Sequence, residues 1–265
     1  MCLILLAVQK HPKYKLILAA NRDEFYERPS EPPHFWEDAP HLLAGRDLVA
    51  AGTWLGITRK GRIAAVTNYR DPANAKPNAP SRGKLVSDFL LGGLDSLSYL
   101  DLIRREKDFY NGFNLILGER DRIQWYSNRS DTVTPLLPGV HGLSNHFLNT
   151  PWPKVVRAKT LFEDLLHSGK NLSTESLFRL LKDQTMAADD RLPRTGVPLD
   201  WERLLSPIFI TSPTYGTRSS SLVLIDKEDR VTFMDRTFNG HPEPVSTSEF
   251  EFVLEPTDRL RDRGT

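Results

Sequence analysis

The chain has little of what several classes of protein require. Its 265 residues include one cysteine, so no internal disulfide can form, and a reducing compartment is expected. Neither charge sign is in excess, with 35 Lys and Arg against 34 Asp and Glu. This balance argues against a basic surface for nucleic acid or for an anionic membrane. No apolar run approaches the roughly 20 residues that a membrane-spanning helix needs.

The apolar run at residues 3–8 lacks the basic leader and the small-residue cleavage site of a signal peptide. We therefore expect it to be a buried strand of a cytoplasmic protein. A hydrophobic content of 39% with 26% charged residues is ordinary for a globular protein with a substantial core. We expect one domain over residues 1–258 and a frayed tail at residues 259–265.

Two apolar runs near the chain start predict a β-hairpin. Residues 3–8 and 16–20 flank Pro12, and both runs are apolar without alternation, which is typical of strands buried on both faces. Reflecting the chain about Pro12 places residue 2 opposite residue 22. The polar residues 21–24 should then lie beside Cys2, at the roughly 5 Å spacing of cross-strand pairs.

The rest of the chain predicts more strands than helices. We expect strands at residues 53–57, 63–67, 113–118, 123–126, 141–145, 207–211, 220–226, 231–234 and 249–254, and helices at residues 85–90, 155–166 and 176–181. The polar segments 71–81 and 187–198 are candidate lids. Strands buried on both faces need cover on both faces, and the helices are too few for a doubly wound parallel sheet. The predicted fold is α+β, a four-layer αββα sandwich of antiparallel sheets.

Cys2 is the only cysteine, and it becomes the first residue once Met1 is removed. Its thiol and a free α-amine would then belong to one residue. Because an α-amine has a pKa near 7.7–8.0, it can accept the thiol proton near neutral pH, so that one residue supplies both nucleophile and base. The alternative is a buried strand cysteine with no chemical task.

The sequence Asn-Arg-Asp-Glu at residues 21–24 ends the second predicted strand abruptly in polar residues. A guanidinium at Arg22 would favour the thiolate of Cys2, and Asp23 could hold the ammonium of the processed terminus or orient Arg22. The alternative is a capped turn that carries solvated charge. The residues expected to contact a substrate are Asn21, Glu24, Trp54 and Tyr69.

Two asparagines, Asn68 and Asn145, each close an apolar strand with an amide side chain. Such donors, aimed at a developing oxyanion, are worth about 3 kcal/mol each in the transition state of acyl transfer, although either asparagine could simply form a turn. Arg218 opens the last long strand and could hold a substrate carboxylate or polarise the site; the alternative is an ordinary strand-edge arginine. The histidines show no metal-ligand spacing, and no phosphate loop or nucleophile elbow is present, so neither a metal nor a cofactor is expected.

In these motifs the sequence resembles the NRDE family, which is named for its Asn-Arg-Asp-Glu signature and includes transport and Golgi organisation proteins. The resemblance spans nearly the whole chain, through Met1-Cys2 and residues 16–26, 52–56, 95–100, 110–114, 142–145, 150–152 and 215–218. That family is similar to the N-terminal-nucleophile hydrolases of the choloylglycine and penicillin V hydrolase type, which cleave non-peptide amides.

The resemblance implies roles for single residues: Cys2 as nucleophile, Asn68 and Asn145 as oxyanion donors, and Arg218 as a late active-site arginine. The signature departs from the hydrolase pattern at one position. Those hydrolases place an arginine before the asparagine, and here that position holds Ala20. Arg22 would have to substitute from its neighbouring position.

Two hypotheses of function follow. The first is an N-terminal cysteine amidohydrolase that acts on a non-peptide amide or another acyl substrate. The second follows from the family's links to secretory organisation, lipid handling and haem transfer: a non-catalytic carrier of haem or an acyl lipid, with an apolar pocket and an axial ligand such as His34, His41 or His146. A scaffold in membrane traffic is a weaker third reading.

Overall fold

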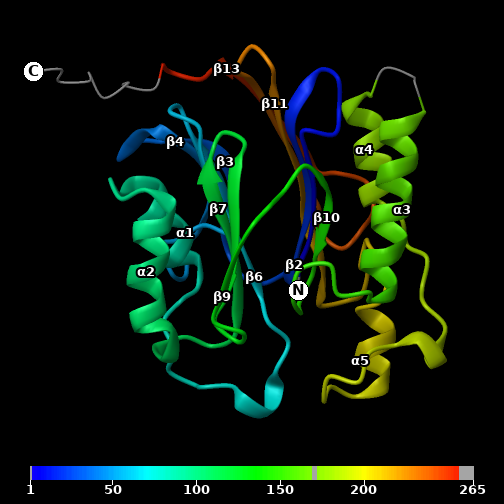
Figure 1. Ribbon diagram of the computed structural model, residues 1–265. Helices are drawn as coiled ribbons and strands as arrows, with labels where there is room; N and C mark the ends of the chain where they lie inside the picture. The colour runs from blue at the N-terminus through cyan, green and yellow to red at the C-terminus, as the bar shows by residue number, and fades with distance from the viewer. Residues whose placement is uncertain (1, 169–171, 257–265) are drawn as a thin grey trace, which may run out of the picture.

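The computed structural model describes residues 2–168 and 172–256. Two antiparallel sheets lie face to face, and helices cover the outer face of each (Figure 1). The first sheet has the order β10 (Gly139–Leu143), β1 (Cys2–Val8), β2 (Tyr14–Phe25), β11 (Tyr215–Asp226), β12 (Arg230–Thr237) and β13 (Ser246–Val253). The second has the order β3 (Ser30–Trp36), β4 (Ala39–Asp47), β5 (Leu55–Thr58), β6 (Arg62–Asn68), β7 (Phe113–Glu119), β8 (Arg122–Ser127) and β9 (Thr132–Pro135).

The helices form the two outer layers. Helices α1 (Gly83–Leu91) and α2 (Ser96–Glu106) lie on the second sheet, and α3 (Pro153–His167) and α4 (Thr174–Leu181) lie on the first (Figure 1). The short helix α5 (Leu199–Leu204) follows α4 in the chain. The predicted four-layer sandwich of antiparallel sheets is therefore confirmed.

Strand β1 shows why an unbroken apolar run predicts this architecture. Because side chains alternate along a strand, Ile4 and Leu6 point between the two sheets, whereas Leu3 and Leu5 point toward α3 and α4. All seven residues of β1 are buried. One strand thus contributes to two separate apolar layers, which only a sheet that is covered on both faces allows.

The predicted hairpin register is also confirmed. Cys2 pairs with Arg22 across β1 and β2, and Arg22 pairs in turn with Ser219 of β11. The nucleophile candidate therefore stands in one row with the polar ends of two neighbouring strands. Strand β2 extends through Phe25, so the Asn-Arg-Asp-Glu signature belongs to the strand itself and not to the turn that follows it.

The strand predicted at residues 207–211 is wrong. Ile208 and Ile210 are fully buried, but this segment is irregular and hydrogen-bonds to side chains and isolated backbone groups: the Ile208 carbonyl accepts from the Asn21 amide, and the Ile210 amide donates to the Thr217 hydroxyl. The segment is apolar because it is buried, and not because it belongs to a sheet. Strand β3 was not anticipated because Pro32 and Pro33 interrupt it, which an edge strand tolerates.

The predicted frayed tail at residues 259–265 lies outside the described residues. Within residues 2–168 and 172–256, no helix is both long enough and apolar enough to cross a bilayer.

Candidate active site

A pocket of about 650 Å³ opens between the two sheets at the end where Cys2 lies. Its walls come from both sheets and from the segment that leads into α1. Among its lining residues are Cys2, Arg22, Asp23, Glu24, Arg28, Trp54, Val66, Asn68, Pro77, Ser81, Arg82, Asn111, Arg218, Ser219, Asp235 and Thr237. The residues expected at the site from sequence divide into seven that line this pocket and three, Asn21, Tyr69 and Asn145, that do not.

Cys2 is buried, with 9% of its surface exposed, and its side of β1 faces the space between the sheets. Burial raises the pKa of its thiol, and the nearby Asp23 raises it further, whereas Arg22 lowers it. The sulfur is thus a neutral thiol at neutral pH unless a base removes its proton. A nucleophilic role requires such a base beside it.

Asp23 lies on the opposite face of β2 from Arg22, toward the helical layer. Its side chain is fully buried, and Thr217 donates a hydrogen bond of 2.8 Å to its Oδ1. Lys154 of α3 lies with Nζ 3.8 Å from its Oδ2. Burial raises the pKa of Asp23, and Lys154 opposes that rise. Although Asp23 is among the residues that line the pocket, its carboxyl group is therefore buried on the helical side of β2.

Asn145 is fully buried behind the pocket, where it organises the corner next to Cys2. Its Nδ2 donates to the backbone carbonyl of Asn68 at 2.8 Å. The neighbouring Ser144 hydroxyl donates to the Cys2 carbonyl at 2.9 Å and lies 3.1 Å from Asn145 Oδ1. The two predicted oxyanion residues are thus in direct contact, but the Asn145 amide is engaged, whereas the Asn68 side chain lines the pocket.

Arg218 lines the pocket and also fixes its floor. Its Nη1 donates to the backbone carbonyls of Phe25, Tyr26 and Arg28 at 2.8, 2.7 and 3.1 Å, so it closes the turn that follows β2. Gly216 is needed for this packing, because a Cβ there would meet Tyr26 Oη at 2.1 Å. The Tyr-Gly-Thr-Arg motif therefore holds the end of the signature strand in place.

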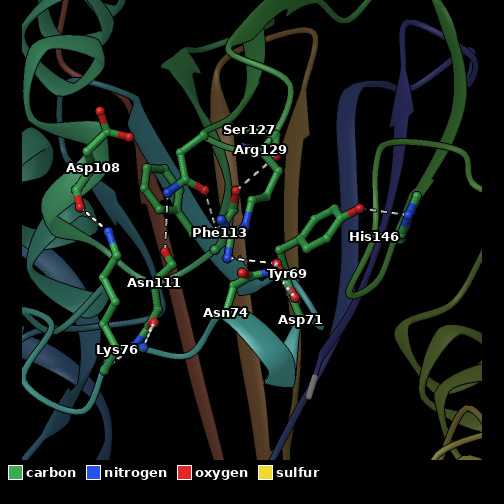
Figure 2. A network of polar contacts seen from close by, with 12 residues as sticks. Tyr69, Asp71, Asn74, Lys76, Asp108, Asn111, Phe113, Ser127, Arg129 and His146 are labelled. Atoms are coloured by element: carbon green, nitrogen blue, oxygen red, sulfur yellow. Dashed lines mark hydrogen bonds and ion pairs between the residues drawn. The ribbon is translucent and has the colours of Figure 1, made fainter. Parts of the chain in front are cut away.

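Asn21 and Tyr69 have other contacts. Asn21 faces the helical layer, where its amide donates to the carbonyls of Leu181 and Ile208 at 2.8 and 2.9 Å. Tyr69 lies beside His146, with its hydroxyl 2.8 Å from Nε2 (Figure 2). The second imidazole nitrogen, Nδ1, lies 2.9 Å from the Thr150 hydroxyl. Both ring nitrogens of His146 are therefore engaged within the protein.

The segment 71–81, one of the candidate lids, forms a wall of the pocket through Pro77 to Ser81. Asn111 holds it by a reciprocal pair of bonds: the Lys76 amide donates to Oδ1 at 2.7 Å, and Nδ2 donates to the Lys76 carbonyl at 3.0 Å (Figure 2). At its start, Asp71 forms an ion pair with Arg129 at 2.8 Å. The other candidate lid, residues 187–198, contributes no lining residue.

The sequence analysis did not single out most of the lining residues, among them Arg82 and Asp235. Arg82 precedes α1 and donates to the Gly112 carbonyl at 3.1 Å; burial lowers its pKa. Asp235 of β12 is buried and accepts from the Ser221 hydroxyl at 2.6 Å. A signal for Asp235 existed in the alternation of Val231, Phe233 and Asp235, which places a carboxyl on the face that packs between the sheets.

We expect the stability of the protein to depend on pH through the buried carboxyl group of Asp235. Burial raises its pKa to about 6, above the usual 3.8. A carboxyl whose pKa is raised on folding stabilises the protein below its unfolded pKa, and that contribution is lost as pH rises through about 6. Between pH 4 and 7 the free energy of unfolding of Asp235→Asn should therefore rise relative to wild type by up to about 3 kcal/mol. Urea unfolding at both pH values measures it, and parallel pH curves for the two proteins would contradict the assignment.

Comparison with solved structures identifies the fold. A Caenorhabditis elegans ortholog of N-acylethanolamine-hydrolyzing acid amidase superposes with a TM-score of 0.52 at 12% identity, over 84% of this chain and 92% of that one. A conjugated bile acid hydrolase from Clostridium perfringens gives 0.50 at 10% identity, over 95% and 92%. At such low identity the likeness concerns the fold alone, that of the N-terminal-nucleophile hydrolases.

Comparison of sequences is closer. The transport and Golgi organization protein 2 homolog of Bos taurus is 38% identical over 96% of this chain and 100% of its own length, and the Homo sapiens homolog is 37% identical over the same shares. The Drosophila melanogaster protein is 28% identical over 91% and 93%. A sequence model of the family described as Transport and Golgi organisation 2 matches residues 1–240. With this match, and with the predicted NRDE resemblance confirmed, the chain belongs to the Transport and Golgi organisation 2 family.

Proposed function

We propose that this protein is an N-terminal cysteine amidohydrolase that acts on a non-peptide amide or another small acyl substrate. The observation that carries the proposal is the position of Cys2: it begins β1, and it lines a pocket of about 650 Å³ that Asn68 also lines. A nucleophile at the edge of a cavity of this size has room for a small substrate.

The proposed reaction begins once Met1 has been removed. The α-amine of Cys2 takes the thiol proton, and the sulfur attacks the acyl carbon, which forms the C–S bond and an oxyanion that Asn68 stabilises. The amine then gives its proton to the leaving nitrogen as the C–N bond breaks. Water attacks the resulting thioester and releases the acid, which restores the thiol. This sequence needs neither a metal nor a cofactor.

Two features of the described residues support this chemistry. Burial raises the pKa of the Cys2 thiol, so the thiol needs a base to remove its proton, and the α-amine of the same residue can supply it. The fold neighbours include a protein named as an amidase and one named as a conjugated bile acid hydrolase, which motivates the amide as the substrate class. The alternative, a haem carrier, lacks a comparable observation, because no histidine is among the described residues that line the pocket.

The test is intact mass spectrometry of protein made in a cell, before and after exposure to a small acyl p-nitrophenyl ester. We expect the mass of the chain without Met1, and then the addition of one acyl group that hydroxylamine removes, as it does for a thioester. Because Cys2 is the only cysteine, a thioester can form nowhere else. The matched control is Cys2→Ser, which should lose the hydroxylamine-sensitive adduct.

Retention of Met1 would contradict the role of the Cys2 amine as base. Unmodified protein after prolonged exposure to the ester, together with saturable binding of haem or an acyl lipid to the same preparation, would contradict the hydrolase and favour the carrier. Either result leaves the fold assignment unchanged.

A further inference from the structure

Lys154 of α3 is an unusual lysine because its ammonium group is sealed inside the protein. Its side chain is 2% exposed, and its Nζ makes no hydrogen bond with any residue in the described ranges. The charged group within reach is the Asp23 carboxylate, at 3.8 Å. Lysine is almost never fully buried unless it is paired, so this position calls for an explanation beyond packing.

The groups around this pair come from several elements. Four residues interact electrostatically with Lys154 or Asp23: Cys2 of β1, Glu24 of β2, Arg70 after β6 and Tyr215 of β11. Arg70 is balanced by Glu202 of α5, which lies 2.5 Å away. Burial lowers the pKa of Lys154 and raises that of Asp23, and their mutual attraction opposes both shifts. Each charge therefore depends on the other.

We propose that Lys154 is a positioning residue for the Cys2 site, whose buried ammonium keeps the Asp23 carboxylate ionised and so able to bind the amine of processed Cys2. Asp23 follows Arg22, the partner of Cys2, along β2, so its backbone lies next to the start of β1. A neutral Asp23 could no longer serve as counter-ion for an ammonium. The charge of Asp23 does not depend on a substrate. Only its role in binding the Cys2 amine rests on the proposed function.

The test is the titration of the Asp23 carboxyl carbon by NMR in wild type and in Lys154→Met. A neighbouring opposite charge lowers a carboxyl pKa by about 1–3 units, so Asp23 should titrate about 1–3 pH units higher in the variant. Lys159→Met is the matched control, because Lys159 lies on the same helix but is partly exposed, and its Nζ donates to Asn149 Oδ1 at 3.0 Å. It should leave the Asp23 titration unchanged.

A folded Lys154→Met protein in which Asp23 titrates as in wild type would overturn the proposal. If that variant does not fold, the wild-type protein still decides, through the ¹⁵N resonance of Lys154 Nζ: a neutral amine at pH 7 overturns the proposal, and a charged one supports it. A slower thioester formation in Lys154→Met, about tenfold at neutral pH, is the expected catalytic consequence. Failure of the proposed function would remove only this last effect.

Discussion

Replacing Glu202 by alanine is expected to destabilise the protein by about 3–5 kcal/mol, because it leaves the guanidinium of Arg70 buried without its counter-ion. Arg70 Nη1 lies 2.5 Å from Glu202 Oε2, and the two side chains are only 5% and 4% exposed. Burial lowers the pKa of Arg70 to about 10, so the group is still charged at neutral pH. Urea unfolding at pH 7 measures the loss.

The same substitution should also disturb the candidate active site, because Arg70 contacts the residues that hold Asn68 in position. The backbone amide of Arg70 donates to the Asn145 carbonyl at 2.7 Å, and its guanidinium lies over the ring of Trp152 at 4.7 Å. Displacing Arg70 therefore moves the residue that holds Asn68. Thioester formation at Cys2 should slow together with the loss of stability.

Glu243→Ala is the control for Glu202→Ala, since Glu243 forms an ion pair of 2.6 Å with Lys182 but is 81% exposed. It should cost less than about 1 kcal/mol. Removing both buried charges, in Glu202→Leu with Arg70→Met, should recover most of the lost stability, because the penalty comes from an unpaired charge. A cost below about 1 kcal/mol for Glu202→Ala would show that water reaches Arg70 and that the pair is not a structural element.

Sequence alone was sufficient to predict the part of the site that depends on local pairing. The hairpin of β1 and β2 is short, so reflecting it about Pro12 placed Cys2 opposite Arg22, which is the pairing found. The layered fold followed from unbroken apolar strands for the same reason, because a run without alternation must be covered on both faces. Both deductions use spacing within one or two neighbouring strands.

The contacts that the sequence did not predict join distant segments. Arg70 and Glu202 are 132 positions apart. Lys154 meets Asp23 from the first turn of α3, which lies before the helix predicted at residues 155–166. Side-chain direction was equally hidden: Asn21 and Asp23 alternate with Arg22 along β2, so adjacent members of the signature face different layers. No periodicity reveals which buried polar group finds which partner, because that depends on how the layers pack.

Asn68→Ala is expected to slow thioester formation at Cys2 by about 100- to 1,000-fold, the usual effect of removing one oxyanion donor. Asn68 lines the same pocket as Cys2, and its side chain makes no hydrogen bond with another described residue, so it is available to a developing oxyanion. For the same reason its removal should leave the free energy of unfolding nearly unchanged. Rates of ester consumption and urea unfolding of the same preparation give both values.

Asn145→Ala should behave differently, although both asparagines were assigned the same role from sequence. The amide of Asn145 is already bound to the Asn68 carbonyl at 2.8 Å, and its Oδ1 contacts Ser144. Truncation leaves that buried carbonyl without its donor, which costs about 1–3 kcal/mol. A loss of stability should thus accompany any loss of rate, because Asn145 holds Asn68 in place and does not itself face the pocket.

Asn74→Ala serves as the matched control for both substitutions, because Asn74 is exposed and its amide contacts only the side chain of Asp71. It should change neither rate nor stability. Asn145→Ala could keep wild-type stability but slow thioester formation, while Asn68→Ala leaves that rate unchanged. In that case Asn145 is the oxyanion donor and Asn68 is not. That outcome would require the Asn145 amide to leave the Asn68 carbonyl during the reaction. The segment around Asn145 would then have to change conformation during catalysis.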